Sequence, residues 1–266
     1  MLLLARCAAF RDDAHMKILL SLIGCLIFAW PAFAADDVLI VADEIPAMEF
    51  LASKLRNQEN LTSKIVLQTA MPADISPYSA VVVYIHKALG EPAEKAFIEY
   101  TKAGGKLVVL HHSISSGKRK NKEWFTFLGV SLPEGDVNAG GYKWLEPVTL
   151  DIVNLAPDHF ITTNKVQYPA KTSFKCLDGT EKPMPAFTLN ESEVYLNHVL
   201  TGTRTLLLGL RFADSATGRV WMQNHAGWVK QSGNGWIVYL LPGHSILDFE
   251  NPAYARIVLN AVIWKP

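Results

Sequence analysis

The sequence contains few cysteines, and most of them lie outside the expected mature domain. Of three cysteines in 266 residues, Cys7 and Cys25 fall within the first 34 residues, which leaves Cys176 alone. A single thiol cannot form an internal disulfide, so we expect the packing of a core to stabilise the fold. The remaining chain, 35–266, is long enough for one large domain.

The sequence also lacks net charge, because 25 Lys and Arg residues balance 25 Asp and Glu residues. This balance gives no electrostatic reason to expect nucleic acid or an anionic membrane surface as a partner. No G-x-S-x-G is present, no cysteine follows a strand at a helix start, and no G-x-G-x-x-G or G-x-x-x-x-G-K-[ST] loop occurs. A small neutral ligand such as a sugar is compatible with these absences.

The N-terminal segment has the pattern of a secretory signal peptide. A Met-Lys start at Met16 precedes the apolar run 18–30, and an Ala-x-Ala cleavage site ends at Ala34. We expect cleavage after Ala34, no membrane span in the mature chain, and a periplasmic or secreted protein. The box that ends at Cys25 resembles a lipoprotein site, but the apolar residues after it argue against lipidation.

Unbroken apolar runs alternate with helical patterns in the first half of the chain. Such runs are typical of parallel strands that are buried on both faces. Their order predicts a doubly wound, mostly parallel α/β sheet of the flavodoxin-like kind. Residues 130–200 contain many prolines and glycines, and they predict a β-hairpin and loop region inserted at one edge of the sheet or over it. The expected strands are 38–42, 65–67, 80–85, 107–110, 205–210, 220–223 and 236–241, and the expected helices are 46–55, 91–102 and 252–264.

Polar and titratable side chains follow four of the expected strands. Ligands of an open parallel sheet bind at the carboxyl ends of its strands, so these residues form the candidate site. Histidine suits both proton transfer near neutral pH and metal binding. A simpler interpretation is that each histidine is a hydrogen-bonded loop residue and that the acids cap the helix at 46–55. The candidates are Asp43, Glu44, His86, His111, His112, Ser113, His244 and Ser245.

Three further features have a structural interpretation beside a functional one. The basic run 118–122 is expected to be a solvated loop. Ser113 could act as a nucleophile with His244 as its base, but the glycines of a nucleophile elbow are missing. Four indoles are suited to stack on a sugar ring, although core packing is the simpler interpretation. They are Trp144, Trp221, Trp228 and Trp236.

Four short sequence blocks are more informative than composition or the positions of single residues. They are 105–112 (GKLVVLHH), 158–161 (DHFI), 191–195 (ESEVY) and 235–264, which contains GWIVYLLPGHS and ends in NAVIW. In order and separation they resemble the ThuA-like (trehalose utilisation) family. The resemblance implies a class I glutamine amidotransferase-like fold without its cysteine nucleophile. It also implies a role in the use of trehalose and related disaccharides, through 3-keto sugars.

The resemblance implies roles for individual residues. His112 lies where amidotransferases have their cysteine, Glu193 and Tyr195 belong to a segment that would close over the pocket, and His244 follows the last core strand. We predict an enzyme that acts on a disaccharide or keto-sugar, with Glu193 and either His112 or His244 as the acid–base pair. Its expected substrate-binding residues are Asp43, Glu44, His111, His159, Tyr195 and Ser245.

Two alternatives stay open at this point. In one, a divalent metal ion polarises the sugar carbonyl and is held by His112, His159, Glu193 and His244. In the other, the protein is a non-catalytic sugar-binding or accessory module. The second is favoured by departures from the family pattern: Phe160 replaces a proline, Ser192 replaces an acid and Trp236 replaces an arginine.

Overall fold

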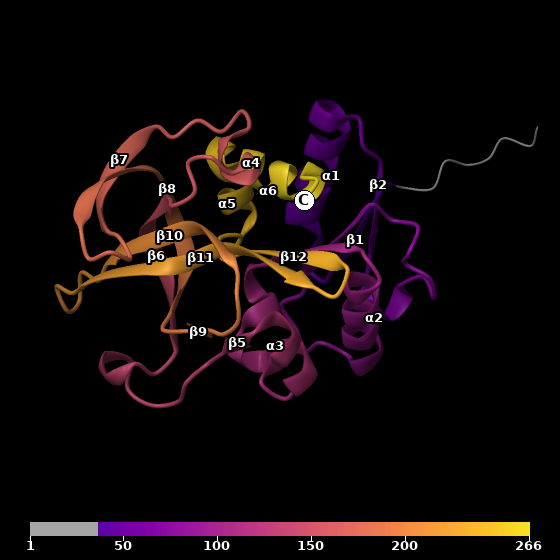
Figure 1. The fold of residues 1–266 in the computed structure, drawn as a ribbon, viewed down its shortest axis with the longest axis horizontal. Coiled ribbons are helices and arrows are strands. Elements are labelled where there is room, and N and C mark those ends of the chain that lie inside the picture. Colours follow the sequence, from indigo (N-terminus) through magenta and orange to yellow (C-terminus); the bar gives the residue numbers. More distant parts are fainter. Residues whose placement is uncertain (1–36) are drawn as a thin grey trace, which may run out of the picture. The chain divides into compact units, whose positions relative to one another are not determined.

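The computed structural model describes residues 37–266 (Figure 1). The signal-peptide prediction, with its cleavage after Ala34 and the lipoprotein-like box at Cys25, falls on residues outside this range. Within residues 37–266, no helix is long and apolar enough to cross a membrane.

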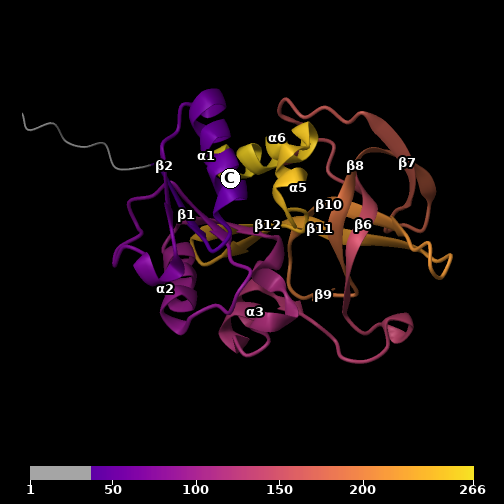
Figure 2. The same cartoon turned by 180° about the vertical axis from the view of Figure 1, so that it is seen from behind.

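Five neighbouring strands form the parallel half of a ten-stranded sheet, in the order β2-β1-β3-β4-β12. Every residue of β1 and β3 is buried, which explains their unbroken apolar runs. Helices cover both faces of this half: α1, α5 and α6 lie on one side and α2 and α3 on the other (Figures 1 and 2). The strands are β1 (Val38–Ala42), β2 (Ser63–Val66), β3 (Ala80–Tyr84), β4 (Lys106–Leu110) and β12 (Gly235–Leu240).

The helices begin and end close to the expected positions. The first, α1, continues for one further turn and stops at Asn60, whose positive φ of 55° gives it a left-handed cap. The last, α6, begins after Asn251, whose side chain accepts from the backbone N–H groups of Ala253 and Tyr254. The helices are α1 (Ile45–Glu59), α2 (Glu91–Lys102), α3 (Lys122–Leu128), α4 (Phe160–Thr163), α5 (Ile246–Glu250) and α6 (Pro252–Ile263).

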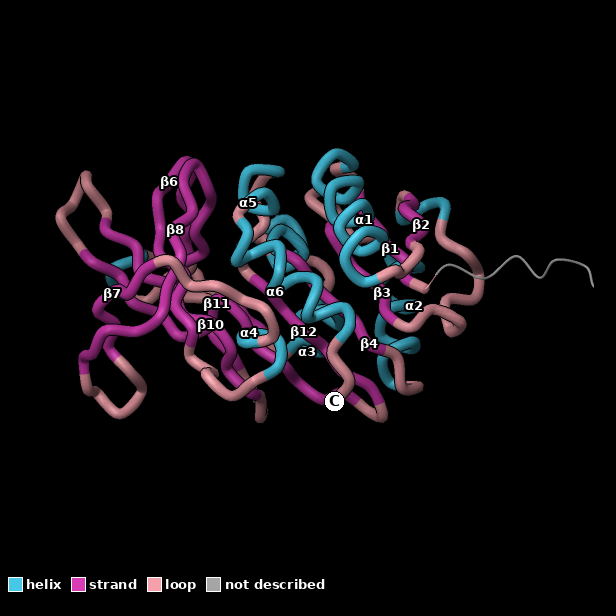
Figure 3. Tube along the Cα trace, turned by 90° about the horizontal axis from the view of Figure 1, so that it is seen from above, coloured by secondary structure: helices cyan, strands magenta, loops and turns pink. Residues whose placement is uncertain are grey.

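The sheet continues beyond β12 as an antiparallel half, in the order β11-β10-β6-β8-β7 (Figure 3). The expectation of a mostly parallel sheet is therefore wrong in this part of the chain, whereas the expected β-hairpin at one edge of the sheet is present as β7 and β8. Residues 130–200 contribute long strands to the same sheet. These strands are β6 (Lys143–Asn154), β7 (Ala170–Lys175), β8 (Glu181–Leu196), β10 (Thr205–Ala213) and β11 (Val220–Ser232); β5 (Val130–Ser131) and β9 (Val199–Leu200) pair separately.

Two prolines explain why the sequence at the start of β8 resembles a loop. Pro183 and Pro185 lie in the part of β8 that pairs only with β7, whereas β6 pairs with residues from Ala186 onwards. Proline lacks a backbone N–H and is tolerated where one side of a strand has no partner. The same strand continues beside β6 and brings Glu193 into contact with the histidines that follow β4.

Candidate active site

The carboxyl ends of β1, β3, β4 and β12 meet at one edge of the sheet, and the predicted polar residues gather there. His111 and His112 directly follow β4 in a short 3-10 turn. His111 has a positive φ of 39°, an uncommon conformation for a residue with a side chain. Both rings are buried and face one another edge to face, with centroids 4.1 Å apart.

Three imidazoles converge on one carboxylate oxygen. Oε2 of Glu193 lies 2.8 Å from His111 Nε2, 3.2 Å from His112 Nε2 and 3.4 Å from His244 Nδ1. The side chains are almost wholly buried except that of His244, which is 22% exposed. We call His111, His112, Glu193 and His244 the His–Glu cluster.

His111 is fixed at both ring nitrogens. Its Nδ1 lies 2.5 Å from the carbonyl oxygen of Leu241, and because a carbonyl only accepts, Nδ1 carries a hydrogen. Its Nε2 faces Glu193. The ring of Tyr195 stacks on His111, with centroids 4.9 Å apart and an interplanar angle of 16°. Tyr195 is fully buried, so it supports His111 from within instead of closing over a pocket.

The loop after β12 presents His244 to the cluster. Asp248 holds this loop, because its Oδ2 accepts from the backbone N–H groups of Gly243 and His244, each at 2.9 Å. The Nε2 of His244 lies 2.9 Å from Glu146 Oε2 on β6. Glu193, followed by the charges of Glu146 and Asp248, raises the pKa of His244, while partial burial opposes the shift.

His112 and Glu193 also have displaced pKa values. Burial and the neighbouring charge of His111 lower the pKa of His112 to about 4, so its ring is neutral at pH 7. Burial by itself would raise the pKa of Glu193, but the three imidazoles that face it outweigh burial and hold that pKa far below its usual range. Glu193 is therefore ionised at neutral pH.

A second polar group adjoins the cluster. The ring of His86 lies flat on that of His112, with centroids 3.9 Å apart and an interplanar angle of 12°. His86 Nδ1 lies 2.6 Å from Glu44 Oε1, and the side chains of His86 and Glu44 are 53% and 37% exposed. This pair forms the open side of the site.

Asp43 and Lys118 fix the backbone at His86. The carboxylate of Asp43 accepts from the backbone N–H groups of His86 (2.7 Å) and Lys87 (2.8 Å). Glu44 occupies the N-cap position of α1, as one interpretation of these acids expected, but its side chain makes no cap hydrogen bond there.

Lys118 corrects a second expectation, because it is fully buried and not part of a solvated loop. Its Nζ donates to the carbonyl oxygen of His86 at 2.8 Å. Burial lowers the pKa of Lys118 to about 8, although the charges of Asp43 and Glu44 oppose the shift.

The sequence model of one known family spans nearly the whole described chain. The model described as ThuA, trehalose utilisation, matches residues 37–265. The chain belongs to the ThuA family. No curated protein matches it.

Solved structures share the ThuA fold at low identity. A ThuA-like protein from Parabacteroides merdae has a TM-score of 0.62 and 16% identity, over 85% of this chain and 88% of that one. One from Bacteroides uniformis has a TM-score of 0.56 and 16% identity, over 87% and 93%. A β-galactosidase from Rahnella sp. R3 has a TM-score of 0.50 and 12% identity, over 85% of this chain and 32% of that one. At such identities the likeness shows the fold alone.

Three of the predicted site residues in this ThuA-family chain make hydrogen bonds within the fold, away from the His–Glu cluster. His159 is not in the cluster: its Nδ1 accepts from the N–H of Ile161 at the start of α4, and its ring lies against Trp264. Ser245 accepts from the N–H of Leu247 at the start of α5. Ser113 donates to the carbonyl oxygen of Val83, so its hydroxyl is committed inside the fold.

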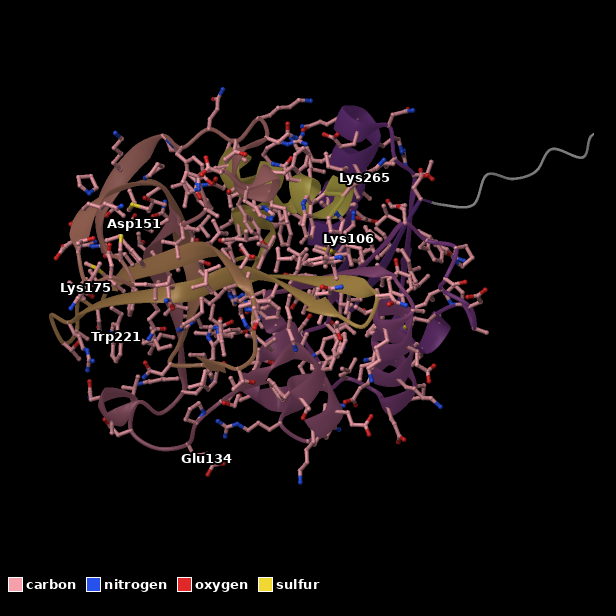
Figure 4. All side chains as sticks on the ribbon, in the orientation of Figure 1. Lys106, Glu134, Asp151, Lys175, Trp221 and Lys265 are labelled. Carbon is pink, nitrogen blue, oxygen red and sulfur yellow. The ribbon has the colours of Figure 1, made fainter. Side chains whose placement is uncertain are left out.

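Only one of the four candidate stacking indoles is largely open. Trp228 is fully buried, and the Arg219 guanidinium lies over the ring of Trp221. Figure 4 labels Trp221 on the antiparallel side of the molecule. Trp236 packs edge to face on Trp264. Trp144, on β6, is 49% exposed.

Sequence reasoning missed Glu146 and Lys118 as parts of the ThuA site, and it named His111 only as a substrate contact. Glu146 follows no strand of the parallel half, so the rule that ligands bind at the carboxyl ends of parallel strands could not find it.

An open hollow of about 840 Å³ beside α2 has a charged lining and includes none of the site residues. Within the described chain, two groups place ligand atoms within 4.8 Å of one another: the His–Glu cluster, and Glu44 with His86 and His112.

Proposed function

We propose that this ThuA-family chain is a carbohydrate-processing enzyme that acts on an oxidised disaccharide at the His–Glu cluster. The convergence of three imidazoles and one carboxylate, from β4, β8 and the loop after β12, carries the proposal. The family's description, trehalose utilisation, supports a sugar as substrate.

The cluster favours an enzyme over a sugar-binding module. A neutral sugar can be bound by hydroxyls, amides and one aromatic face, which need no buried charge. Burying an ionised carboxylate with three imidazoles costs solvation free energy, and such groups with displaced pKa values concentrate at catalytic sites. The open edge at His86 and His244 gives a substrate access to these groups.

The site is suited to a reaction at the carbon atom next to a sugar ketone. Removing a proton from the carbon beside the ketone moves the electron pair of the C–H bond towards the oxygen, which needs stabilisation there. In this proposal the His–Glu cluster stabilises the negative charge that develops on the oxygen of the sugar ketone. The proton goes to His86, since Glu44 orients its Nδ1 and more than half of its side chain is exposed. This assignment differs from the predicted acid–base pair of Glu193 with His112 or His244. Here His112 and His244 face the oxygen, and Glu193 orients their rings.

Turnover of 3-keto-trehalose tests this function. We expect the wild-type chain to exchange or eliminate the proton beside the ketone, seen by NMR in D₂O, and His112→Ala to lose at least about 100-fold in rate. His159→Ala is the matched control and should keep near wild-type activity. Tight binding of the sugar without turnover by the wild type would instead identify a binding module.

We also propose that the protein acts in the periplasm or outside the cell. The leader pattern that ends at Ala34 supports this location. N-terminal sequencing of the mature chain should give Ala35 as the first residue; a retained Met1 or Met16 would contradict it. The strand order β2-β1-β3-β4-β12 supports the further proposal of a doubly wound, amidotransferase-like origin.

A further inference from the structure

We infer that the His–Glu cluster binds one divalent transition-metal ion, with zinc as the best match, through His111, His112, Glu193 and His244. The role of this ion rests on the proposed function, because the ion would be the group that polarises the ketone oxygen of the sugar. His111 takes the place that the sequence had given to His159.

The donor set is that of a transition-metal site. Three imidazoles and one carboxylate suit zinc and similar ions, whereas magnesium and calcium prefer oxygen ligands only. The four ligand atoms lie within 4.8 Å of one another. Ligands about 2.1 Å from a tetrahedral ion lie roughly 3.4 Å apart. The separations of 2.8, 3.2 and 3.4 Å from Glu193 Oε2 are already close to that value.

The ring orientations fit one central ion. The three imidazoles meet edge to face, at 73°, 73° and 61°, so their in-plane lone pairs approach from different directions. The neighbouring group of Glu44, His86 and His112 does not fit as well. His86 and His112 are stacked at 12°, and the in-plane lone pairs of parallel rings do not converge on one point.

Two of the three outward-facing nitrogens, those of His111 and His244, are held as in metal-binding histidines; Nδ1 of His112 is buried without a hydrogen-bond partner. Such a histidine usually donates its other N–H to a carbonyl or a carboxylate, which fixes the tautomer and the ring. His111 does so to the carbonyl oxygen of Leu241, and His244 faces Glu146. The inward-facing Nδ1 of His244 is buried and makes no aligned hydrogen bond, although Glu193 lies 3.4 Å away. This nitrogen is directed at the space between the ligands.

Metal content and affinity test the inference without any substrate. The full chain is stripped with a chelator and titrated with Zn²⁺, and with Co²⁺ as a visible probe. We expect one ion per chain and a metal-dependent rise in Tm. His111→Ala and Glu193→Gln should weaken binding at least about 100-fold. His86→Ala and His159→Ala, controls beside and outside the cluster, should bind like the wild type.

Several results would overturn the inference: no stoichiometric ion, no rise in Tm of the wild type, or a loss in His159→Ala as large as that in His111→Ala. The rise in Tm keeps the test valid if a buried variant fails to fold. Metal binding without turnover would refute the proposed function and leave the metal site. Turnover by a chain that binds no metal ion would refute the metal site and leave the proposed function.

Discussion

Asp248 holds the backbone of His244: its Oδ2 accepts the N–H of His244 at 2.9 Å, from a position that is 1% exposed. The same oxygen accepts from the hydroxyl of Ser192, the residue before Glu193. One buried carboxylate thus ties together the two segments that supply Glu193 and His244. Asp43 likewise holds the loop that carries His86, because its carboxylate accepts the backbone N–H of His86.

Asp248→Ala should therefore displace His244 from the cluster. We expect metal affinity and kcat to fall at least about 10-fold, together with a loss of about 2–3 kcal/mol in the free energy of unfolding, because three donors lose their acceptor. Asp178→Ala is the control, since Asp178 accepts from the N–H of Thr180 in an exposed turn. A variant that unfolds more easily but keeps wild-type metal affinity would contradict the positioning role.

Glu146→Gln tests the carboxylate behind His244. Glu146 contributes to the raised pKa of His244, so removing its charge should lower that pKa, which can be followed by NMR titration in the metal-free protein. Metal affinity at neutral pH should fall about 10-fold, because the ligand loses its outer partner. Glu134→Gln, at an exposed pair with Arg119, should change neither quantity. An unchanged His244 pKa would refute this coupling.

Trp144→Ala tests whether the exposed indole contacts the sugar. Trp144 pairs with Tyr195 across β6 and β8 and lies two residues from Glu146, so it shares the face that leads to the site. We expect KM for a keto-disaccharide to rise about 5- to 10-fold with little change in kcat, because a pyranose presents C–H groups to an aromatic face. Leu177→Ala, at the most exposed large apolar residue described, should leave KM unchanged.

Two buried histidines away from the site predict loss of stability in acid. Burial above all holds the pKa of His198 well below its usual range, and it lowers that of His225 to about 4. The unfolded chain then binds more protons below about pH 6.5, so stability is complete above this pH and is lost as the pH falls towards 4. In His198→Leu, the free energy of unfolding should fall less between pH 7.5 and 5. An equal fall in both proteins would exclude His198 as a cause.

The parallel half of the fold was predictable because strands buried on both faces appear as continuous apolar runs. In the antiparallel half, parts of β10 and β11 were expected as strands, but their antiparallel pairing was not. Pro183 and Pro185 also make the start of β8 resemble a loop. The rule of carboxyl ends found His112 and His244. It also listed His111, but it did not show that His111 joins the same cluster, because the turn that directs both His111 and His112 inwards depends on a positive φ at His111. His159 was expected from the family resemblance alone.

Glu193 shows a different limit of sequence reasoning. It lies on β8, and its place beside β4 depends on the register of β6 and β8, which shifts near Val148. No local pattern encodes such a register, so only the resemblance to the ThuA family pointed to Glu193. Glu146 had no such support and emerged only from the structure.

The central claim is that His111, His112, Glu193 and His244 form one centre, and anomalous scattering from crystals grown with Zn²⁺ tests it most directly. The account predicts one strong peak at the zinc edge, about 2.1 Å from nitrogens of His111, His112 and His244 and from a carboxylate oxygen of Glu193. A peak that includes His159 or His86 in place of His111, or no peak at these four residues, would contradict it.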